Sequence, residues 1–196
     1  MQSKDKVFVC IGSGPSLTLE DCRFVESLDV ELVAVNRSAA LVSRGHAYIG
    51  DLSYWKVTAD ANKALKNRTV WTHSPTVAST HNVHLFRGLP GSWNSGQKAI
   101  ELAAHLGATK IVLIGYDCSL KNGIHWHGSH KLINPTLRDP VARGVIKWQQ
   151  EFAQVLTSVK VPITNCSRYT ELTCFTQKIL EEELSSLPQV HLLKTF

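Results

Sequence analysis

A glycine-containing turn at residues 12–17, Gly-Ser-Gly-Pro-Ser-Leu, is the feature that most limits what this chain can fold into. The turn follows the apolar run of residues 7–11 and precedes a helical pattern. Two glycines at the end of a strand let the backbone approach a ligand closely, and the helix behind them presents free N–H groups to negative charge. This arrangement is typical of a nucleotide site, although a tight strand-to-helix turn without a ligand uses the same glycines.

Apolar runs typical of strands alternate with helical patterns along the sequence. Several runs, such as residues 111–114, are apolar at successive positions, as expected for parallel strands that are covered on both faces. We therefore expect an α/β fold: a Rossmann-like, doubly wound, mostly parallel sheet with helices on both faces. The expected strands are residues 6–11, 31–36, 46–49, 69–72, 83–86, 110–114 and 161–165.

Capping residues predict where the helices begin and end. Thr18 is placed to cap the first helix, whose opening turn carries Glu20 and Asp21 where the helix dipole favours acidic groups. Gly107 is placed to end another helix. The expected helices follow Thr18, cover residues 97–106, run from Asp139-Pro140 to about residue 159, and cover residues 176–184.

Composition narrows the class of protein. The 196 residues, 43% of them hydrophobic, can bury one core, so we expect residues 1–196 to form a single nucleotide-binding domain. No signal peptide or membrane span is expected, and five scattered cysteines indicate reduced thiols in a cytoplasmic protein. The net charge of +5 comes from dispersed residues, which favours phosphate-bearing small ligands and gives no support for nucleic-acid binding.

Polar residues and glycines follow the ends of several expected strands, where open parallel sheets bind their ligands. The carboxamide of Asn36 can read a base edge or a ribose hydroxyl, or it can cap the helix that follows. The helix N-terminus at residues 94–96 can cradle a phosphate or carboxylate while Asn94 caps it, and Asp51 can bind a hydroxyl or a metal, or merely form a turn. The predicted nucleotide-binding residues, which we expect to line one cleft, are Gly12, Ser13, Gly14, Pro15, Ser16, Asn36, Arg37, Asp51, Asn94, Ser95, Gly96, Tyr116 and Asp117.

More than twenty residues without periodicity separate residue 115 from the helix expected at Asp139. Loops of this length are usually functional or disordered, and the three histidines His125, His127 and His130 favour a functional loop. Imidazole suits general base catalysis near neutral pH, so the three are candidate catalytic residues. They can also order the loop by hydrogen bonding. The spacing H-x-H-x-x-H matches the zinc motif of metallo-β-lactamase-like hydrolases, but neighbouring carboxylate ligands are not evident, so no metal site is assigned.

Other conspicuous residues have structural interpretations. The stripe of Val145, Trp148, Phe152 and Val155 has helical spacing and predicts core packing. The cysteines lack a neighbouring base in the sequence and are interpreted as core residues.

The glycine turn, Asn36, the Asn94-Ser95-Gly96 helix start, the Ile-Gly-Tyr-Asp segment at residues 114–117 and the histidine loop together resemble the small bacterial sialyltransferases. These are metal-independent, Rossmann-like glycosyltransferases that use CMP-activated sialic acid. The same skeleton is similar to a wider family that contains the archaeal 6-hydroxymethylpterin pyrophosphokinase and the flagellin motility accessory factors. The resemblance implies that Gly12, Gly14, Pro15 and Ser16 hold the phosphate side of the nucleotide, that Asn36 reads the nucleoside, that Ser95 and Gly96 meet the donor phosphate or sugar carboxylate, and that His127 or His130 is the general base.

The expected function is therefore that of a nucleotide-sugar-dependent glycosyltransferase. Its donor is a CMP-type nucleotide sugar, its acceptor is a glycan or another hydroxyl compound, and it requires no cofactor. The alternatives are a nucleotide-dependent pyrophosphokinase of the pterin type, a non-catalytic nucleotide-binding protein and, on the histidine spacing alone, a His-ligated metallohydrolase. The chain can also form a homo-oligomer.

Overall fold

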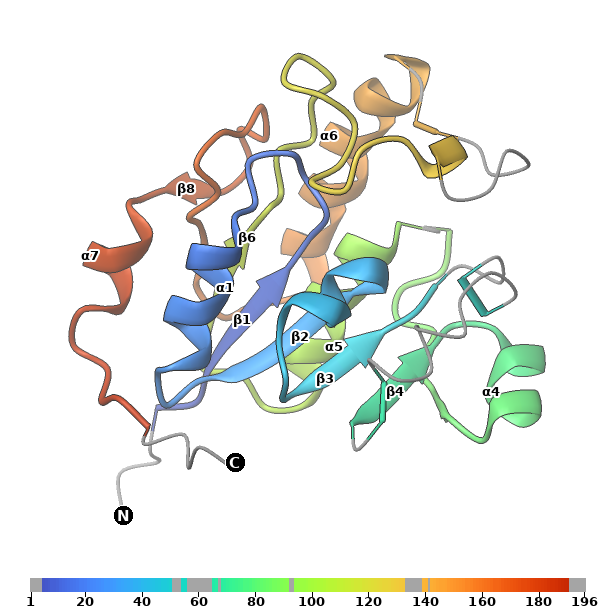
Figure 1. Ribbon diagram of the computed structural model, residues 1–196, viewed down its shortest axis with the longest axis horizontal. Helices are drawn as coiled ribbons and strands as arrows, with labels where there is room; N and C mark the ends of the chain where they lie inside the picture. The colour runs from blue at the N-terminus through green and yellow to red at the C-terminus, as the bar shows by residue number, and fades with distance from the viewer. Residues whose placement is uncertain are drawn as a thin grey trace.

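A computed structural model describes residues 5–50, 54–55, 65–66, 68–91, 94–132, 139–140 and 142–190. The strands in these ranges form one sheet in which every neighbouring pair runs parallel (Figure 1). They are β1 Val7–Ile11, β2 Glu31–Val35, β3 His46–Tyr48, β4 Thr69–Thr72, β5 His84–Leu85, β6 Lys110–Ile114, β7 Ile163–Asn165 and β8 Thr176–Gln177. Their order across the sheet is β5-β4-β3-β2-β1-β6-β7-β8.

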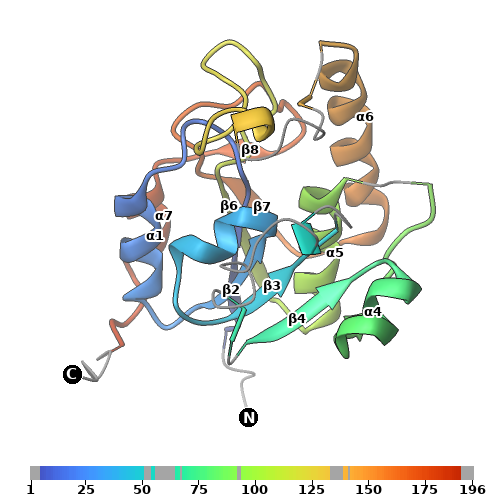
Figure 2. The ribbon, with the colours of Figure 1, turned by 45° about the vertical axis from the view of Figure 1, so that its right-hand side comes forward.

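Helices cover both faces of this sheet. They are α1 Leu19–Glu26, the 3₁₀ turn η1 Asn36–Leu41, α4 Pro75–His81, α5 Ser95–His105, the 3₁₀ turn η2 His130–Leu132, α6 Ala142–Ser158 and α7 Leu180–Leu184. Figure 2 shows α1 and α7 on one side of the sheet and α5 and α6 on the other.

Two apolar cores, one on each face, follow from the alternation of side chains along each strand. In β1, Val7, Val9 and Ile11 join the core beneath α1 and α7, whereas Phe8 and Cys10 join the core beneath α5 and α6. All five side chains are buried. The structure therefore confirms the predicted α/β, Rossmann-like, doubly wound fold.

The strand order reverses between β1 and β6. From β1 the chain moves outward through β2 to β5, and then α5 returns it to the centre, where β6 pairs with β1 on the side opposite β2. Open parallel sheets bind their ligands at the carboxyl ends of the strands where the strand order reverses, which here is the end of β1 and β6.

Two local predictions are confirmed. The hydroxyl of Thr18 accepts a hydrogen bond from the N–H of Asp21 (3.1 Å), whose carboxylate accepts one from the N–H of Thr18 (3.3 Å), so a capping box starts α1. Gly107 follows the C-terminus of α5 with φ +90°, a conformation that glycine adopts without strain. The first fixes the start of α1 behind the glycine turn, and the second ends α5 before β6 begins.

Other predicted boundaries are wrong. Residues 176–184 do not form one helix, because Thr176–Gln177 pairs with β7 as strand β8 and α7 begins only at Leu180. The helix expected from Asp139 is described from Ala142, and the Asp139 carboxylate binds Ser129 and His130 of the preceding loop. The elements α4 and β8 were not expected, and several strands are shorter than predicted. The tertiary pairing of β8 overrides the helical pattern there.

Candidate functional site

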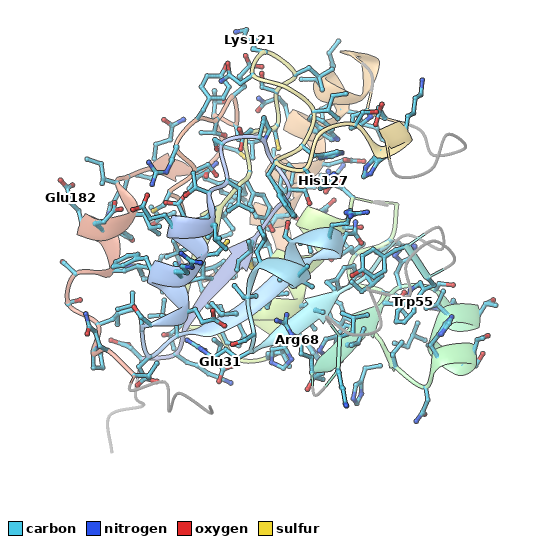
Figure 3. All side chains as sticks on the ribbon, viewed as in Figure 1. Glu31, Trp55, Arg68, Lys121, His127 and Glu182 are labelled. Atoms are coloured by element: carbon cyan, nitrogen blue, oxygen red, sulfur yellow. The ribbon has the colours of Figure 1, made fainter. Side chains whose placement is uncertain are left out.

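A cavity of about 470 Å³ lies at the carboxyl ends of the central strands. Its walls come from the turn after β1, the end of β2, the N-terminus of α5, the loop after β6 and the N-terminal half of α6. Figure 3 shows His127 at this end of the sheet, opposite Glu31 at the start of β2. The predicted residues that line the cavity are Gly12, Ser13, Gly14, Pro15, Asn36, Arg37, Asn94, Ser95, Gly96, Tyr116, Asp117, His125, His127 and His130.

Among the described residues, Ser16 is predicted for the site but does not line this cavity, because it points its hydroxyl and its N–H to the carboxylate of Asp117. The prediction for Asp51 lies outside the described residues. The structure brings the other predicted strand-end features together, including the histidine loop and the glycine turn.

The glycine turn packs directly against the end of β6. The N–H of Gly12 donates to the carbonyl of Ile114 (2.8 Å), and the N–H of Gly14 donates to the carbonyl of Gly115 (2.7 Å). A Cβ on Gly12 would lie 2.4 Å from the Gly115 oxygen, and one on Gly14 would lie 1.9 Å from Oδ1 of Asp117. These glycines are thus required by the close approach of two loops of the chain itself.

Asp117 satisfies the donors of the turn. Its carboxylate accepts hydrogen bonds from the N–H of Ser16 (2.9 Å) and from the hydroxyl of Ser16 (2.7 Å). Burial raises the pKa of Asp117, and the bonds from Ser16 oppose that shift. The N–H groups of Gly14 and Ser16 thus already have acceptors within the protein, and the role of these residues on the phosphate side of a nucleotide stays a prediction.

Asn36 joins two strand ends. Its backbone has a φ of +48°, and its Oδ1 accepts a hydrogen bond from the N–H of Gly50 (3.1 Å), directly beyond β3. Asn36 does not cap η1, whose N-cap position is Val35 without a side-chain cap. The capping interpretation is wrong, and recognition of a nucleoside by Asn36 stays a prediction.

Asn94 caps α5 as predicted. Its Oδ1 accepts hydrogen bonds from the N–H groups of Gly96 (2.9 Å) and Gln97 (3.3 Å), and its Nδ2 donates to Glu151 on α6 (3.2 Å). The hydroxyl of Ser95 lies close against Gly50, since a Cβ there would be 2.2 Å from it. The N-terminus of α5 is therefore partly satisfied by its own cap.

Tyr116 is buried beside this helix start. Its hydroxyl donates to the carbonyl of Gly96 (3.1 Å), and its N–H donates to the hydroxyl of Ser167 (2.7 Å). Burial raises the pKa of Tyr116 well above its ordinary value, so the phenol stays neutral. The side chain holds the loop after β6 against α5.

The histidine loop is docked on the glycine turn. The N–H of Trp126 donates to the carbonyl of Ser13 (3.2 Å), and Nδ1 of His125 lies 3.3 Å from the same oxygen. The indole of Trp126 donates to the hydroxyl of Ser38 (3.0 Å), which itself donates to the carbonyl of Gly12 (2.5 Å). Ser38 is fully buried and links the loop, η1 and the turn.

Asp139 anchors the other end of the loop. Its carboxylate accepts hydrogen bonds from the hydroxyl of Ser129 (2.6 Å) and the N–H of His130 (2.8 Å). The bond from Ser129 is the main reason that the pKa of Asp139 lies below its usual range. Both flanks of the histidine segment are thus fixed by hydrogen bonds.

The three imidazoles form one cluster. Ring centroids are 4.4 Å apart for His125 and His130, 5.0 Å for His125 and His127, and 5.2 Å for His127 and His130. Burial lowers the pKa of His125 to about 4, and burial together with the charges of its neighbours, including Arg37, lowers that of His127 to about 3. Both rings are neutral at pH 7 and can accept a proton.

Three buried nitrogens around the cavity have no hydrogen-bond partner within the described part of the chain. They are Nε of Arg37, Nε2 of His125 and Nδ1 of His127. All three residues line the cavity. A buried polar atom without a partner costs about 1–3 kcal/mol, so such atoms are rare unless a ligand or water satisfies them. Three residues with an unpartnered buried nitrogen thus lie on one part of the cavity lining.

The N-terminal half of α6 contributes residues that the sequence analysis did not assign to the site. Lys147, Trp148 and Glu151 line the cavity together with Phe152. The predicted core packing of the stripe is confirmed for Phe152 and Val155, which are buried, whereas Trp148 is half-buried and faces the cavity. The sequence signal that could have identified this part of the site is the i, i+4 pair of Lys147 and Glu151, which lies beside Trp148 on the same helix.

The described residues contain no candidate metal site, no membrane-spanning helix and no disulfide. No group of three or more His, Cys, Asp or Glu side chains among them is arranged to hold a metal ion. No helix in the described ranges has the length and apolar character needed to cross a membrane. All five cysteines are free thiols.

Comparisons of the chain with protein-family models, with curated proteins and with solved structures give no significant match.

Proposed function

We propose that this protein is a nucleotide-sugar-dependent glycosyltransferase whose donor binds in the strand-end cavity. The observation that carries the proposal is that Arg37, His125 and His127, each with an unpartnered buried nitrogen, line one cavity at the switch point of the sheet. A ligand with several oxygen acceptors satisfies such a wall. Nucleotide phosphates have this chemistry.

Arg37 is the proposed anchor for the phosphate. Its Nε is buried and unpartnered at the cavity wall, and a guanidinium pairs with phosphate through parallel hydrogen bonds. The glycine turn is a weaker anchor, because its Gly14 and Ser16 N–H groups bind Gly115 and Asp117. Arg37 also faces the charge that the leaving phosphate develops, and stabilising developing charge is a large part of catalysis.

His127 is the proposed general base. Its Nδ1 is unpartnered at the cavity, whereas Nδ1 of His125 lies at the Ser13 carbonyl. In the transfer step, the acceptor oxygen forms a bond with the anomeric carbon and the bond from that carbon to the phosphate oxygen breaks. The electron pair leaves with the nucleotide, and the acceptor proton moves to the imidazole.

The low pKa of His127 fits this role only when an anion is bound. A conjugate acid with a pKa of about 3 marks a weak base, but a phosphate beside the ring stabilises the imidazolium and raises the pKa toward neutrality. Donor binding would thus switch on the base. The same coupling means that nucleotide affinity should rise as the pH is lowered from 8 to 6, provided that the fold is intact.

The test is calorimetric titration of the protein with CMP, UDP, GDP and ATP. We expect one nucleotide to bind, and Arg37→Gln to weaken it about tenfold or more, as for a lost charged hydrogen bond. Arg23→Gln is the matched control, because Arg23 is exposed on α1 and does not line the cavity. Equal effects of the two variants, or no binding of any nucleotide, would overturn the proposal.

Catalysis is tested by following nucleotide release from the matching nucleotide sugar in the presence of glycan acceptors. His127→Asn should keep nucleotide affinity and lose on the order of a hundredfold or more in turnover. His130→Asn and His125→Asn identify the base if His127→Asn retains turnover. Parent-like turnover in all three variants would remove the base-catalysed mechanism, and transfer of pyrophosphate from ATP instead would indicate the pyrophosphokinase.

A further inference from the structure

The cavity has a second end with different chemistry. Its α6 wall presents Trp148, Glu151 and Lys147, and none of these belongs to the wall formed by Arg37 and the imidazoles. In Figure 2, α6 stands across the strand ends from the turn that follows β1. The two walls therefore need not bind the same part of a ligand.

Glu151 makes the α6 wall unfavourable for phosphate. The residue is only 7% exposed, and its carboxylate accepts a hydrogen bond from Nδ2 of Asn94 (3.2 Å) and lies 3.4 Å from Nζ of Lys147. Two carboxylate oxygens offer about four lone-pair sites, so acceptor capacity remains after these two contacts. A fixed carboxylate repels an anion and accepts hydrogen bonds from hydroxyl groups. Neutral polyhydroxyl compounds fit this wall.

Trp148 adds an apolar platform beside the carboxylate. The indole is half-buried against the core beneath α6 and lines the cavity. Phe152, one turn along the helix, packs its ring against Tyr116 and Phe175, whereas no aromatic ring in the described ranges contacts Trp148. An aromatic face next to a few fixed polar groups is the usual composition of a pocket for a ring with both apolar and hydroxylated sides.

We infer that Trp148, Glu151 and Lys147 form a pyranose subsite, in which the indole faces the C–H side of the sugar ring and Glu151 and Lys147 bind its hydroxyl groups. This inference rests on the proposed function only in that the sugar belongs to a glycosyl-transfer reaction. The ring is either the sugar of the nucleotide donor or the terminal sugar of the acceptor. Both sources present the same chemistry to the α6 wall.

The experiment measures sugar and nucleotide binding separately. Saturation-transfer NMR with methyl glycosides tests a free pyranose, and calorimetry compares CMP-sialic acid, UDP-glucose and GDP-mannose with CMP, UDP and GDP. Trp148→Leu keeps apolar bulk on the core and removes the aromatic face. Trp71→Leu is the matched control, because Trp71 is also half-buried against the same core but does not line the cavity.

If the subsite exists, Trp148→Leu weakens one of two quantities about tenfold: the binding of the methyl glycoside, or the gain in affinity of a nucleotide sugar over its nucleotide. Trp71→Leu leaves both quantities unchanged. Glu151→Gln, which keeps the shape of the side chain, should reduce the same quantity several-fold if Trp148→Leu does not fold. Loss confined to the nucleotide sugar assigns the donor, and loss confined to the glycoside assigns the acceptor.

Two results would overturn the subsite. One is a parent protein in which neither a methyl glycoside nor the sugar of any nucleotide sugar contributes to binding. The other is an unchanged sugar contribution in both Trp148→Leu and Glu151→Gln. Failure of the proposed function can be distinguished from failure of the subsite. It appears as absence of nucleotide binding, whereas the NMR experiment with methyl glycosides still tests the α6 wall.

Discussion

The cavity has two contrasting walls: the glycine-turn wall, formed by residues 12–15, and the histidine wall, formed by Arg37, His125 and His127. They differ in whether their hydrogen-bonding groups have partners within the chain. In the turn, the N–H groups of Gly12, Gly14 and Ser16 all donate to acceptors of the chain. In the histidine wall, Arg37 and His127 each keep a buried nitrogen without a partner in the described residues. A satisfied wall stabilises the fold, and an unsatisfied one costs stability that only a ligand restores. The glycine turn, which is the motif most typical of a ligand site, therefore has a mainly structural role in this chain.

The largest expected effect on stability comes from adding a side chain to a glycine of the glycine-turn wall. Gly14→Ala places a Cβ 1.9 Å from Asp117 and 2.7 Å from the carbonyl of Gly115, so one of the two loops must move. We expect a loss of about 3 kcal/mol or more in the free energy of unfolding, measured by denaturant titration. Gly91→Ala is the control, since no atom of the described residues lies within 4 Å of a Cβ placed there and its positive φ alone costs about 1 kcal/mol. Equal losses would mean that the close approach of the loops is not important.

Removing the internal acceptor should have the next largest effect. Asp117→Ala leaves the N–H and hydroxyl of Ser16 without their acceptor, and we expect about 2 kcal/mol of destabilisation. The accompanying test is sulfate, which should restore part of the lost stability of Asp117→Ala and leave the parent nearly unchanged, because the vacated donors then resemble an ordinary anion site. A variant as stable as the parent would show that the turn does not depend on Asp117.

The contrast between the walls also explains what could be predicted from the sequence. The glycine turn, the helix starts capped by Thr18 and Asn94, and the carboxyl ends of the central strands follow from local patterns, and the structure places them as expected. The hydrogen bonds that Ser16 donates to Asp117 and Gly50 donates to Asn36 join segments that only the sheet brings together, so local sequence patterns could not predict them. The same holds for Trp148, whose stripe predicts a buried face but not that one edge of this face meets a cavity.

Acid should weaken the histidine wall. The folded pKa values of His125 and His127 lie near 4 and 3, below the value of about 6.5 expected in the unfolded chain, so the unfolded state binds protons first as the pH falls. Stability should be constant above pH 7 and fall from pH 6.5 toward pH 4. The expected loss is on the order of 2 kcal/mol per imidazole, after allowing for solvent screening of these half-buried rings.

Chemical denaturation at a series of pH values between 7 and 5 measures this slope. His127→Asn should flatten it, and His105→Asn, which changes an exposed histidine at the end of α5, should not. His46, whose pKa burial also lowers, adds a background in the same direction in every variant. A parent slope that persists unchanged in His127→Asn would place the sensitivity outside the cavity.

The smallest expected effect on stability gives the sharpest comparison, because it sets two arginines against each other. Arg44 donates hydrogen bonds to the carbonyls of Val30 (2.6 Å), Leu28 (2.7 Å) and Glu26 (3.0 Å), so Arg44→Met should cost about 2 kcal/mol. Arg37→Met removes an equal charge and a buried nitrogen that lacks a partner, so its free energy of unfolding should change by less than about 0.5 kcal/mol or rise. The order reverses for nucleotide binding, which Arg37→Met should abolish and Arg44→Met should leave intact at temperatures where it is folded. If Arg37→Met instead destabilises the ligand-free protein as much as Arg44→Met does, Arg37 is part of the scaffold, and the division of the cavity into a structural wall and a binding wall is wrong.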